Sequence, residues 1–342
     1  MPELRIAVVG AGILGRRYAR VLHELEGAAL AGVTSRTFER AQEVASAWGA
    51  PAYASVHELL HELPCDAVAV ATPDHLHTDV VLAALRHGRH VLVEKPLATR
   101  AHEATAMVRE ARERGLVLQV NYSQRWVTEY AWIKQHIDDG VIGRPVLATS
   151  SKQDTSYVPT RMIAWAADTS PIFFMSSHDL DLVAWFFGAR ATRVVAHEQR
   201  GVLEARGIAV HDAVDALVRY DNGASASFHS SWIHPETWPT IVTERMTIIG
   251  ERGVIHYEGR ERRVSCFNDQ GGENVSFTGP QTATEVEGRL EGGFRSSLAE
   301  FCRCVRSGEE PATSAARTLH VTETQLAIVA SAAGDGVPTP VG

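Results

Sequence analysis

The chain has 342 residues, of which 45% are hydrophobic and 22% charged, a composition ordinary for a soluble globular protein. Its length suggests two domains. The net charge of −8 and the absence of a lysine- and arginine-rich run argue against a nucleic-acid partner. No apolar stretch reaches the ~20 residues needed to cross a bilayer, and the N-terminus leaves no room for a signal peptide. We therefore expect a cytoplasmic protein with no membrane partner.

Cysteine and lysine are both scarce. The 4 cysteines are too few for a disulfide scaffold and lack paired zinc spacing, so no metal site is expected. There are only three lysines, Lys95, Lys134 and Lys152, because arginine supplies most of the positive charge. Each lysine is therefore a more noticeable candidate for chemistry than usual.

The first 120 residues alternate between short apolar runs and stretches with helical spacing. Glycines punctuate the joints between them. The sequence predicts strands over 4–9, 28–33, 67–71, 90–93 and 116–120, separated by helices over 14–25, 38–48, 80–87 and 102–114. Strand and helix repeated in this way predict an α/β fold with a doubly wound parallel sheet.

A full G-x-G-x-x-G motif follows the first strand and opens the first helix, the context typical of a dinucleotide site. Gly10 permits the tight turn, and Gly12 lets the backbone approach a pyrophosphate. Gly15 allows the helix to pack closely on the strand. Ile13 and Leu14 lie at the helix start, where free N–H groups would hold the anion. The alternative is a glycine-rich turn without a ligand.

The end of the second strand should contact the adenosine ribose. An acidic residue there binds the 2′-hydroxyl of NAD, whereas an arginine accommodates the 2′-phosphate of NADP. This chain has Ser35 and Arg36, and no acid before Glu39. NADP is therefore the favoured cofactor and NAD the other possibility. The alternative is that Arg36 is a surface residue beginning a helix.

Polar motifs follow the next two predicted strands, where ligands bind in open parallel sheets. Their residues, which we expect to contact the cofactor, are Thr72, Pro73, His75 and His77 after the predicted strand 67–71, and Glu94 and Lys95 before Pro96 after the predicted strand 90–93. With the glycine motif, they closely resemble the glucose-fructose oxidoreductase, inositol dehydrogenase and rhizopine-catabolism family. The resemblance covers nearly the whole chain.

The resemblance implies a two-domain dehydrogenase. Residues 1–122 would form the dinucleotide-binding domain, and residues 123–342 an α+β substrate domain with a large, mostly antiparallel sheet. That sheet would also mediate a homodimer or homotetramer. Independently of the resemblance, the segment 215–228 contains two strand-like runs joined by the hairpin signal Asp-Asn-Gly.

The resemblance also implies which residues perform the chemistry. Oxidising an alcohol requires a group that handles the hydroxyl proton. Lys95 would contact the reacting oxygen, and His178 with Asp181 matches the family's catalytic His-x-x-Asp helix. Asn121 and Lys152 are further candidates for substrate binding, together with Lys95 and His178. The alternatives are that Lys95 pairs with its neighbouring glutamate, and that His178 is a solvated residue at a helix start.

One position departs from the family pattern. Many members have an aspartate four residues before the histidine, where this chain has Phe174. We predict an NAD(P)-dependent oxidoreductase acting on a hydroxyl or carbonyl group of a sugar, polyol or related cyclic alcohol. The apolar residues Phe173, Phe174 and Met175 suggest, as alternatives, a less polar diol as substrate or a catalytically weak, cofactor-binding sensor.

Overall fold

The computed structural model describes residues 3–342 and divides into two compact units. The first contains the chain up to Trp126 together with Pro280–Leu319, and the second contains Val127–Gly279 with His320–Gly342. The sequence-based division at residue 122 placed 280–319 in the second domain. These residues instead pack in the first unit, because the apolar side of α9 (Gly293–Ser307) joins its core through Phe294, Leu298 and Phe301.

The first unit contains a six-stranded sheet in the order β3-β2-β1-β4-β5-β6, in which every neighbouring pair is parallel. This order confirms the predicted doubly wound sheet. The strands are β1 (Leu4–Val9), β2 (Ala28–Thr34), β3 (Ala52–Tyr53), β4 (Ala67–Val70), β5 (His90–Val93) and β6 (Leu118–Val120).

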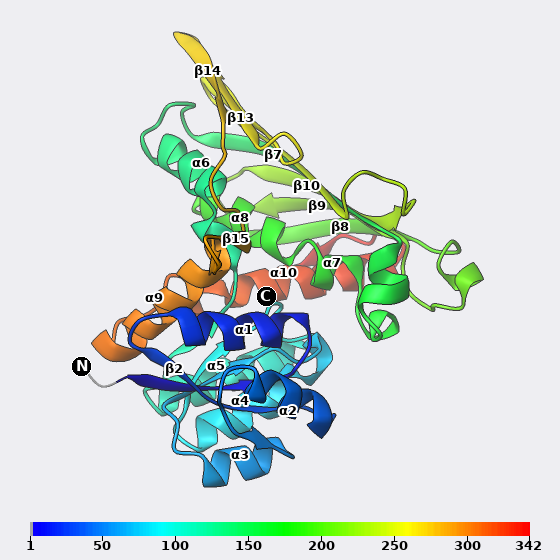
Figure 1. The fold of residues 1–342 in the computed structure, drawn as a ribbon. Helices are drawn as coiled ribbons and strands as arrows, with labels where there is room; N and C mark the ends of the chain where they lie inside the picture. Colours follow the sequence, from blue (N-terminus) through cyan, green and yellow to red (C-terminus); the bar gives the residue numbers. More distant parts are fainter. Residues whose placement is uncertain (1–2) are drawn as a thin grey trace. The chain divides into compact units, whose positions relative to one another are not determined.

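Helices lie on both sides of this sheet (Figure 1). Side chains of α1, α2 and α9 share one core cluster with β1 and β2, whereas α4 and α5 pack against each other. The bounds are α1 (Ile13–Glu24), α2 (Phe38–Ser46), α3 (Val56–Glu62), α4 (His77–Arg86) and α5 (Ala101–Glu113), with short 3₁₀ turns η1 (Asp74–Leu76) and η2 (Ser123–Trp126).

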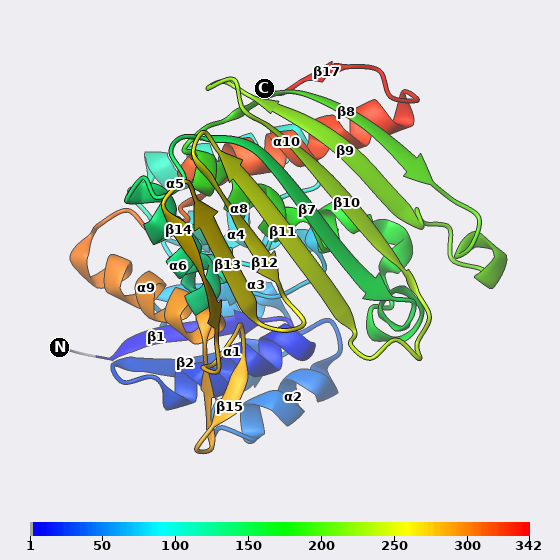
Figure 2. The ribbon, with the colours of Figure 1, turned by 90° about the horizontal axis from the view of Figure 1, so that it is seen from above.

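The second unit contains a nine-stranded sheet in the order β14-β13-β12-β11-β7-β10-β9-β8-β17 (Figure 2). Only β7 and β10 pair in parallel, so the sheet is mostly antiparallel, as expected. The strands are β7 (Pro145–Thr155), β8 (Ala191–Gln199), β9 (Ala213–Tyr220), β10 (Ser225–His234), β11 (Val242–Gly250), β12 (Gly253–Glu258), β13 (Arg263–Asn268), β14 (Gly271–Ser276) and β17 (Thr339–Pro340).

Helices cover one face of this sheet, with α8 packed on β7 and α6 on β13 (Figure 2). The predicted hairpin is confirmed, because β9 and β10 are joined by a turn in which Gly223 has a φ of +85°. The remaining bounds are α6 (Thr128–Asp138), α7 (Pro171–Phe174), α8 (Ser177–Phe187), α10 (Ala315–Ala333), the π-helical turn η3 (Val158–Met162), and the 3₁₀ turns η4 (Ala166–Asp168) and η5 (Glu204–Arg206).

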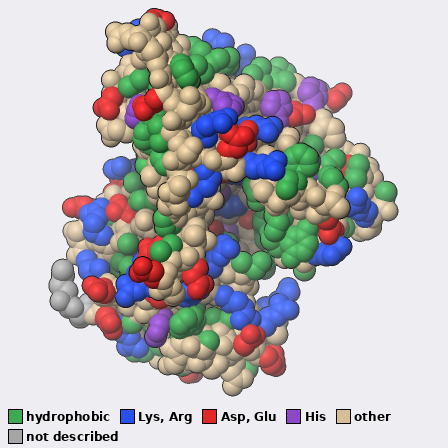
Figure 3. All heavy atoms as spheres, turned by 45° about the horizontal axis from the view of Figure 1, so that its top comes forward, with side chains coloured by type: hydrophobic (Ala, Val, Ile, Leu, Met, Phe, Trp, Pro, Cys, Tyr) green, Lys and Arg blue, Asp and Glu red, His purple; other side chains and the backbone are tan. Residues whose placement is uncertain are grey.

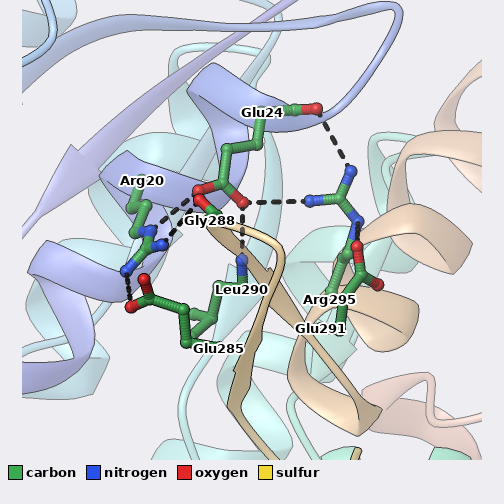
Figure 4. A network of polar contacts seen from close by, with 7 residues as sticks. All are labelled: Arg20, Glu24, Glu285, Gly288, Leu290, Glu291 and Arg295. Carbon is green, nitrogen blue, oxygen red and sulfur yellow. Dashed lines mark hydrogen bonds and ion pairs between the residues drawn. The ribbon is translucent and has the colours of Figure 1, made fainter.

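A hairpin of β15 (Thr284–Val286) and β16 (Arg289–Glu291) is fastened to α1 within the first unit (Figure 4). Glu24 accepts hydrogen bonds from Arg20 at 2.7 Å, from the Leu290 N–H at 2.9 Å and from Arg295 at 3.2 Å. Burial acts to raise the pKa of Glu24, but these donors outweigh it and lower that pKa. The charged network therefore holds the hairpin and α9 against the end of α1.

The surface carries both signs of charge. On the face drawn in Figure 3, acidic and basic side chains are interspersed, with hydrophobic groups exposed beside them. Within residues 3–342, no helix is long and apolar enough to cross a membrane.

Candidate functional site

The glycine motif forms a tight turn between β1 and α1. A Cβ on Gly10, whose φ is +109°, would lie 2.4 Å from the Ala71 carbonyl oxygen, and one on Gly15 would lie 1.8 Å from the Gly10 oxygen. A Cβ on Gly12 would meet nothing within 4 Å, and Gly12 has no side chain with which to cap α1. Two glycines are thus required by packing, whereas the third leaves open space at a helix N-terminus, as an anion-binding turn requires. Ile13, the first residue of α1, is 52% exposed.

Ser35 and Arg36 lie between the end of β2 and the start of α2. Ser35 is half-buried and Arg36 is exposed. Across residues 3–342, no carboxylate forms an ion pair with Arg36. The guanidinium is therefore available to an anionic ligand.

His77 connects the segments that follow β4 and β5. Its Nδ1 lies 2.9 Å from the Pro96 carbonyl oxygen, and its Nε2 lies 3.1 Å from the Thr72 carbonyl oxygen. The ring is buried, and this burial lowers the pKa of His77. Since both ring nitrogens face backbone carbonyls, His77 positions Thr72 and Pro96, and its direct contact with a cofactor stays a prediction.

His75 and Pro73 are half-buried in the same segment. The His75 ring lies 3.6 Å from the carboxylate of Asp74, whose oxygen also accepts the His75 backbone N–H at 2.7 Å. Asp74 is buried and was not singled out from the sequence. Asp74 therefore adds a buried carboxylate to the segment after β4, in which the sequence analysis had singled out only His75 and His77 as ionisable groups.

A buried triad of hydrogen bonds occupies the carboxyl edge of the first sheet. The Tyr18 hydroxyl, from α1, donates to Glu94 Oε1 at 2.8 Å. Asn121 Nδ2 lies 2.8 Å from the same oxygen and 2.8 Å from the Tyr18 hydroxyl. Burial and the nearby Glu94 carboxylate raise the pKa of Tyr18, which therefore stays protonated and able to donate.

Lys95 lies between two of these fixed groups. Glu94 before it bonds Tyr18 and Asn121, and the Pro96 carbonyl after it faces His77. Glu94 and Pro96 are buried, but Lys95 is only half-buried. The residues on both sides of Lys95 are thus fixed by hydrogen bonds, and Lys95 itself keeps partial access to solvent. Substrate contact by Asn121 stays a prediction, since its amide is used in the triad.

His178 lies in the first turn of α8 and is half-buried, whereas its neighbours are buried and anchored. Ser176 bonds Ser230 on β10, and Ser177 donates to the Phe173 carbonyl oxygen. Gln325 of α10 donates to the Ser177 hydroxyl at 2.8 Å. Ser176 precedes α8 without its side chain capping the helix.

Asp181 is 1% exposed and follows His178 by three residues in the same helix, which places both on one side of α8. The next residue after His178, Asp179, was missed by the sequence analysis. Its Oδ1 lies 3.2 Å from Lys152 Nζ, and Glu244 Oε2 lies 3.0 Å from the same nitrogen. Lys152 is buried between these carboxylates, so its contact with a substrate stays a prediction.

Phe174 packs in an aromatic group. Its ring centroid lies 5.8 Å from that of Trp165 and 6.1 Å from that of Trp232. Trp232 is fully buried, whereas Phe174 and Trp165 are half-buried at the edge of this cluster. Four residues before His178, the structure therefore has an apolar wall.

Comparison with known proteins agrees with this geometry. Residues 4–122 match the model described as an oxidoreductase family with an NAD-binding Rossmann fold, and residues 130–256 match the GFO/IDH/MocA C-terminal domain. The chain belongs to this family. It is 31% identical to a 1,5-anhydro-D-fructose reductase of Ensifer adhaerens, over 67% of this chain and 69% of the relative.

Two further relatives cover most of the chain. It is 29% identical to the scyllo-inositol 2-dehydrogenase (NAD(+)) of Bacillus subtilis, over 90% of this chain and 88% of the relative. Among solved structures, the WlbA dehydrogenase of Bordetella pertussis, in complex with NADH and UDP-GlcNAcA, is similar with a TM-score of 0.82 at 25% identity. That similarity covers 99% of each chain. The chain thus has the NAD-binding Rossmann fold of the family together with its C-terminal domain.

Proposed function

We propose that this protein is an NAD(P)-dependent dehydrogenase or reductase acting on a CH–OH group of a cyclic polyol or sugar. The observation that carries the proposal is Lys95, held by the Tyr18–Glu94–Asn121 triad at the carboxyl edge of a Rossmann sheet with an open glycine turn. Ligands bind at this edge of parallel sheets. The relatives named as inositol dehydrogenases support the same class of substrate.

Oxidation of a CH–OH group removes a hydride from carbon and a proton from oxygen. The nicotinamide cofactor, when bound, supplies the hydride acceptor. Lys95 would stabilise the negative charge that develops on the substrate oxygen. His178 would accept the hydroxyl proton, and the Asp181 carboxylate would stabilise the resulting imidazolium. In the reductive direction the same residues return the proton to the oxygen.

A separate part of the proposal concerns the choice between NADP and NAD. Because Arg36 is exposed and has no ion pair among residues 3–342, we favour NADP, with its 2′-phosphate bound by Ser35 and Arg36. The B. subtilis relative is named for NAD(+), so NAD is the competing cofactor. Dissociation constants of both cofactors with this protein distinguish the two.

The substrate itself is tested by a panel of inositols, sugars and apolar diols, assayed at 340 nm with each cofactor. Reduction of NAD or NADP by an inositol or a sugar supports the proposal. Preference for an apolar diol would instead favour the alternative that the Phe174 wall suggests. Cofactor binding without turnover of any substrate would support a sensor.

We also propose that the protein forms a homodimer or homotetramer through the outer face of its nine-stranded sheet. Leu147, Ile249, Val254 and Phe267 lie opposite one another on four successive strands. Leu147 is 37%, Ile249 39% and Phe267 45% exposed. A second copy would remove this apolar row from water. Light scattering of the parent and of an Ile249→Lys variant tests this proposed oligomer. A monomeric parent would contradict it.

A further inference from the structure

Lys152 is a buried cation between two carboxylates that come from different elements. It lies on β7, directly opposite Glu244 on β11 in the strand register. Its second partner, Asp179, belongs to the first turn of α8, which packs on β7. The ammonium therefore bridges the sheet and the helix that carries His178.

The bridge is closed by further hydrogen bonds. The Tyr257 hydroxyl lies 3.3 Å from Glu244 Oε1, and Tyr130 also hydrogen-bonds Glu244. Burial acts to lower the pKa of Lys152, but Asp179 and Glu244 outweigh it and raise that pKa. Lys152 is therefore charged over the whole working pH range, and its pairing with Asp179 persists.

We propose that Lys152 is a positioning residue, which fixes the first turn of α8 through Asp179 and so sets the place of the His178 ring. The inference rests on the proposed function of His178 and names what holds that residue in place. Ser176 and Ser177 are anchored to β10 and α10, but Asp179 provides the connection of this turn to β7. Catalysis is sensitive to such support, since a 1 Å misplacement can lower the rate by about 10²-fold.

The main test is Lys152→Met, which removes the charge and keeps a side chain of similar length. We expect kcat to fall by about 10²-fold, whereas the dissociation constant for the cofactor, bound by the first unit, should not change. The variant also leaves two carboxylates without their cation, so its melting temperature should fall.

A matched control separates positioning from stability. Arg262 forms a comparable pair with the fully buried Glu129 in the same unit, at 2.6 Å. Arg262→Met should lower the melting temperature as well, but the folded enzyme should keep the parental kcat. If Arg262→Met and Lys152→Met reduce kcat equally, the proposal is wrong.

A triple variant covers the case in which Lys152→Met does not fold. Lys152→Met with Asp179→Asn and Glu244→Gln removes the bridge without leaving a buried charge, so the melting temperature should return toward that of the parent. Its kcat should stay low, because the connection from α8 to β7 is still missing. A parental kcat in the triple variant would overturn the proposal. It would mean that the bridge contributes to stability alone.

A readout without turnover distinguishes this proposal from the proposed function. With ¹³C-labelled histidine rings, the His178 signal is identified as the one lost in His178→Gln. That signal should shift in the triple variant and stay in place in Arg262→Met. If the parent oxidises no substrate but the signal shifts, the proposed function fails and the positioning stands. An unshifted signal refutes the positioning whatever the activity.

Discussion

The Tyr18 hydroxyl donates a 2.8 Å hydrogen bond to Glu94, the residue immediately before Lys95. This bond joins the helix that follows the glycine turn to the end of β5. Helix α1 and the Lys95 backbone are therefore held at a fixed separation. A change in this bond should affect the use of the cofactor as well as stability.

Tyr18→Phe should lower the free energy of unfolding by about 1.5–3 kcal/mol, because a buried carboxylate loses a hydrogen bond. We also expect a lower kcat, since Glu94 is adjacent to Lys95. Denaturant unfolding and steady-state kinetics measure both effects. Tyr53→Phe is the control, as Tyr53 is half-buried in the same unit and its hydroxyl has no hydrogen bond among residues 3–342. Equal losses in the two variants would argue against the triad.

Lys95→Met should abolish turnover while leaving the fold and cofactor binding intact. The ammonium is expected to stabilise the negative charge on the substrate oxygen, and the loss of one such electrostatic contact lowers kcat by roughly 10²–10³-fold. Turnover at 340 nm and cofactor fluorescence quenching measure the two effects separately. Near-parental turnover would transfer this role to His178 or to water.

Arg36→Ala should weaken the binding of NADP far more than the binding of NAD. Loss of a charge-assisted hydrogen bond is worth about 1.5–3 kcal/mol, which corresponds to roughly ten- to a hundredfold in affinity. Titration of both cofactors against parent and variant measures the difference. A parent that prefers NAD, or an equal loss for both cofactors, would show that Arg36 does not bind the phosphate.

Asp181→Asn should reduce kcat much more than it weakens cofactor binding. The amide cannot stabilise a charged imidazole at His178, and Phe174 stands where many family members have a second carboxylate. Phe174→Asp should correspondingly shift activity toward more hydroxylated substrates. Unchanged turnover in Asp181→Asn would favour the sensor interpretation.

Glu24→Gln should make stability less dependent on acidic pH. The pKa of Glu24 is lowered in the folded protein, so its contribution is fully present above about pH 4.5 and is lost as the pH falls through the folded pKa. The melting temperature of the parent should therefore fall more between pH 6 and pH 3.5, two values bracketing that range, than that of Glu24→Gln. Parallel pH curves would mean that the Glu24 network contributes little.

The sequence predicted the elements that depend on local signals. The glycine motif and the alternation of apolar runs are read within a few residues, and they led to the six-stranded sheet. The role of Tyr18 could not be read in this way, because a tyrosine at helical spacing looks like a core residue and its partner is 76 positions away. Asp179 was hidden for the same reason, since Lys152 meets it only after β7 and α8 pack.

Both candidate catalytic groups share an arrangement that no motif describes. Lys95 and His178 are each half-buried between buried neighbours whose polar groups are bonded. The motifs placed these two candidate residues at a strand end and at a helix start, and the structure has them there. They did not reveal the supporting residues, which come from distant segments and vary in chemistry.

Because residues 280–319 belong to the first unit, the order of synthesis affects when that unit can fold. Phe294, Leu298 and Phe301 complete the core that α1 and β1 begin. During translation these side chains emerge only after all the large sheet's strands except the short β17 at the C-terminus. The first unit is therefore the first to be synthesised, but its core is completed only when α9 has emerged. Until then, the apolar surface that α9 covers stays exposed to water. A fragment ending at residue 126 should keep that surface exposed and aggregate, although it contains the entire parallel sheet.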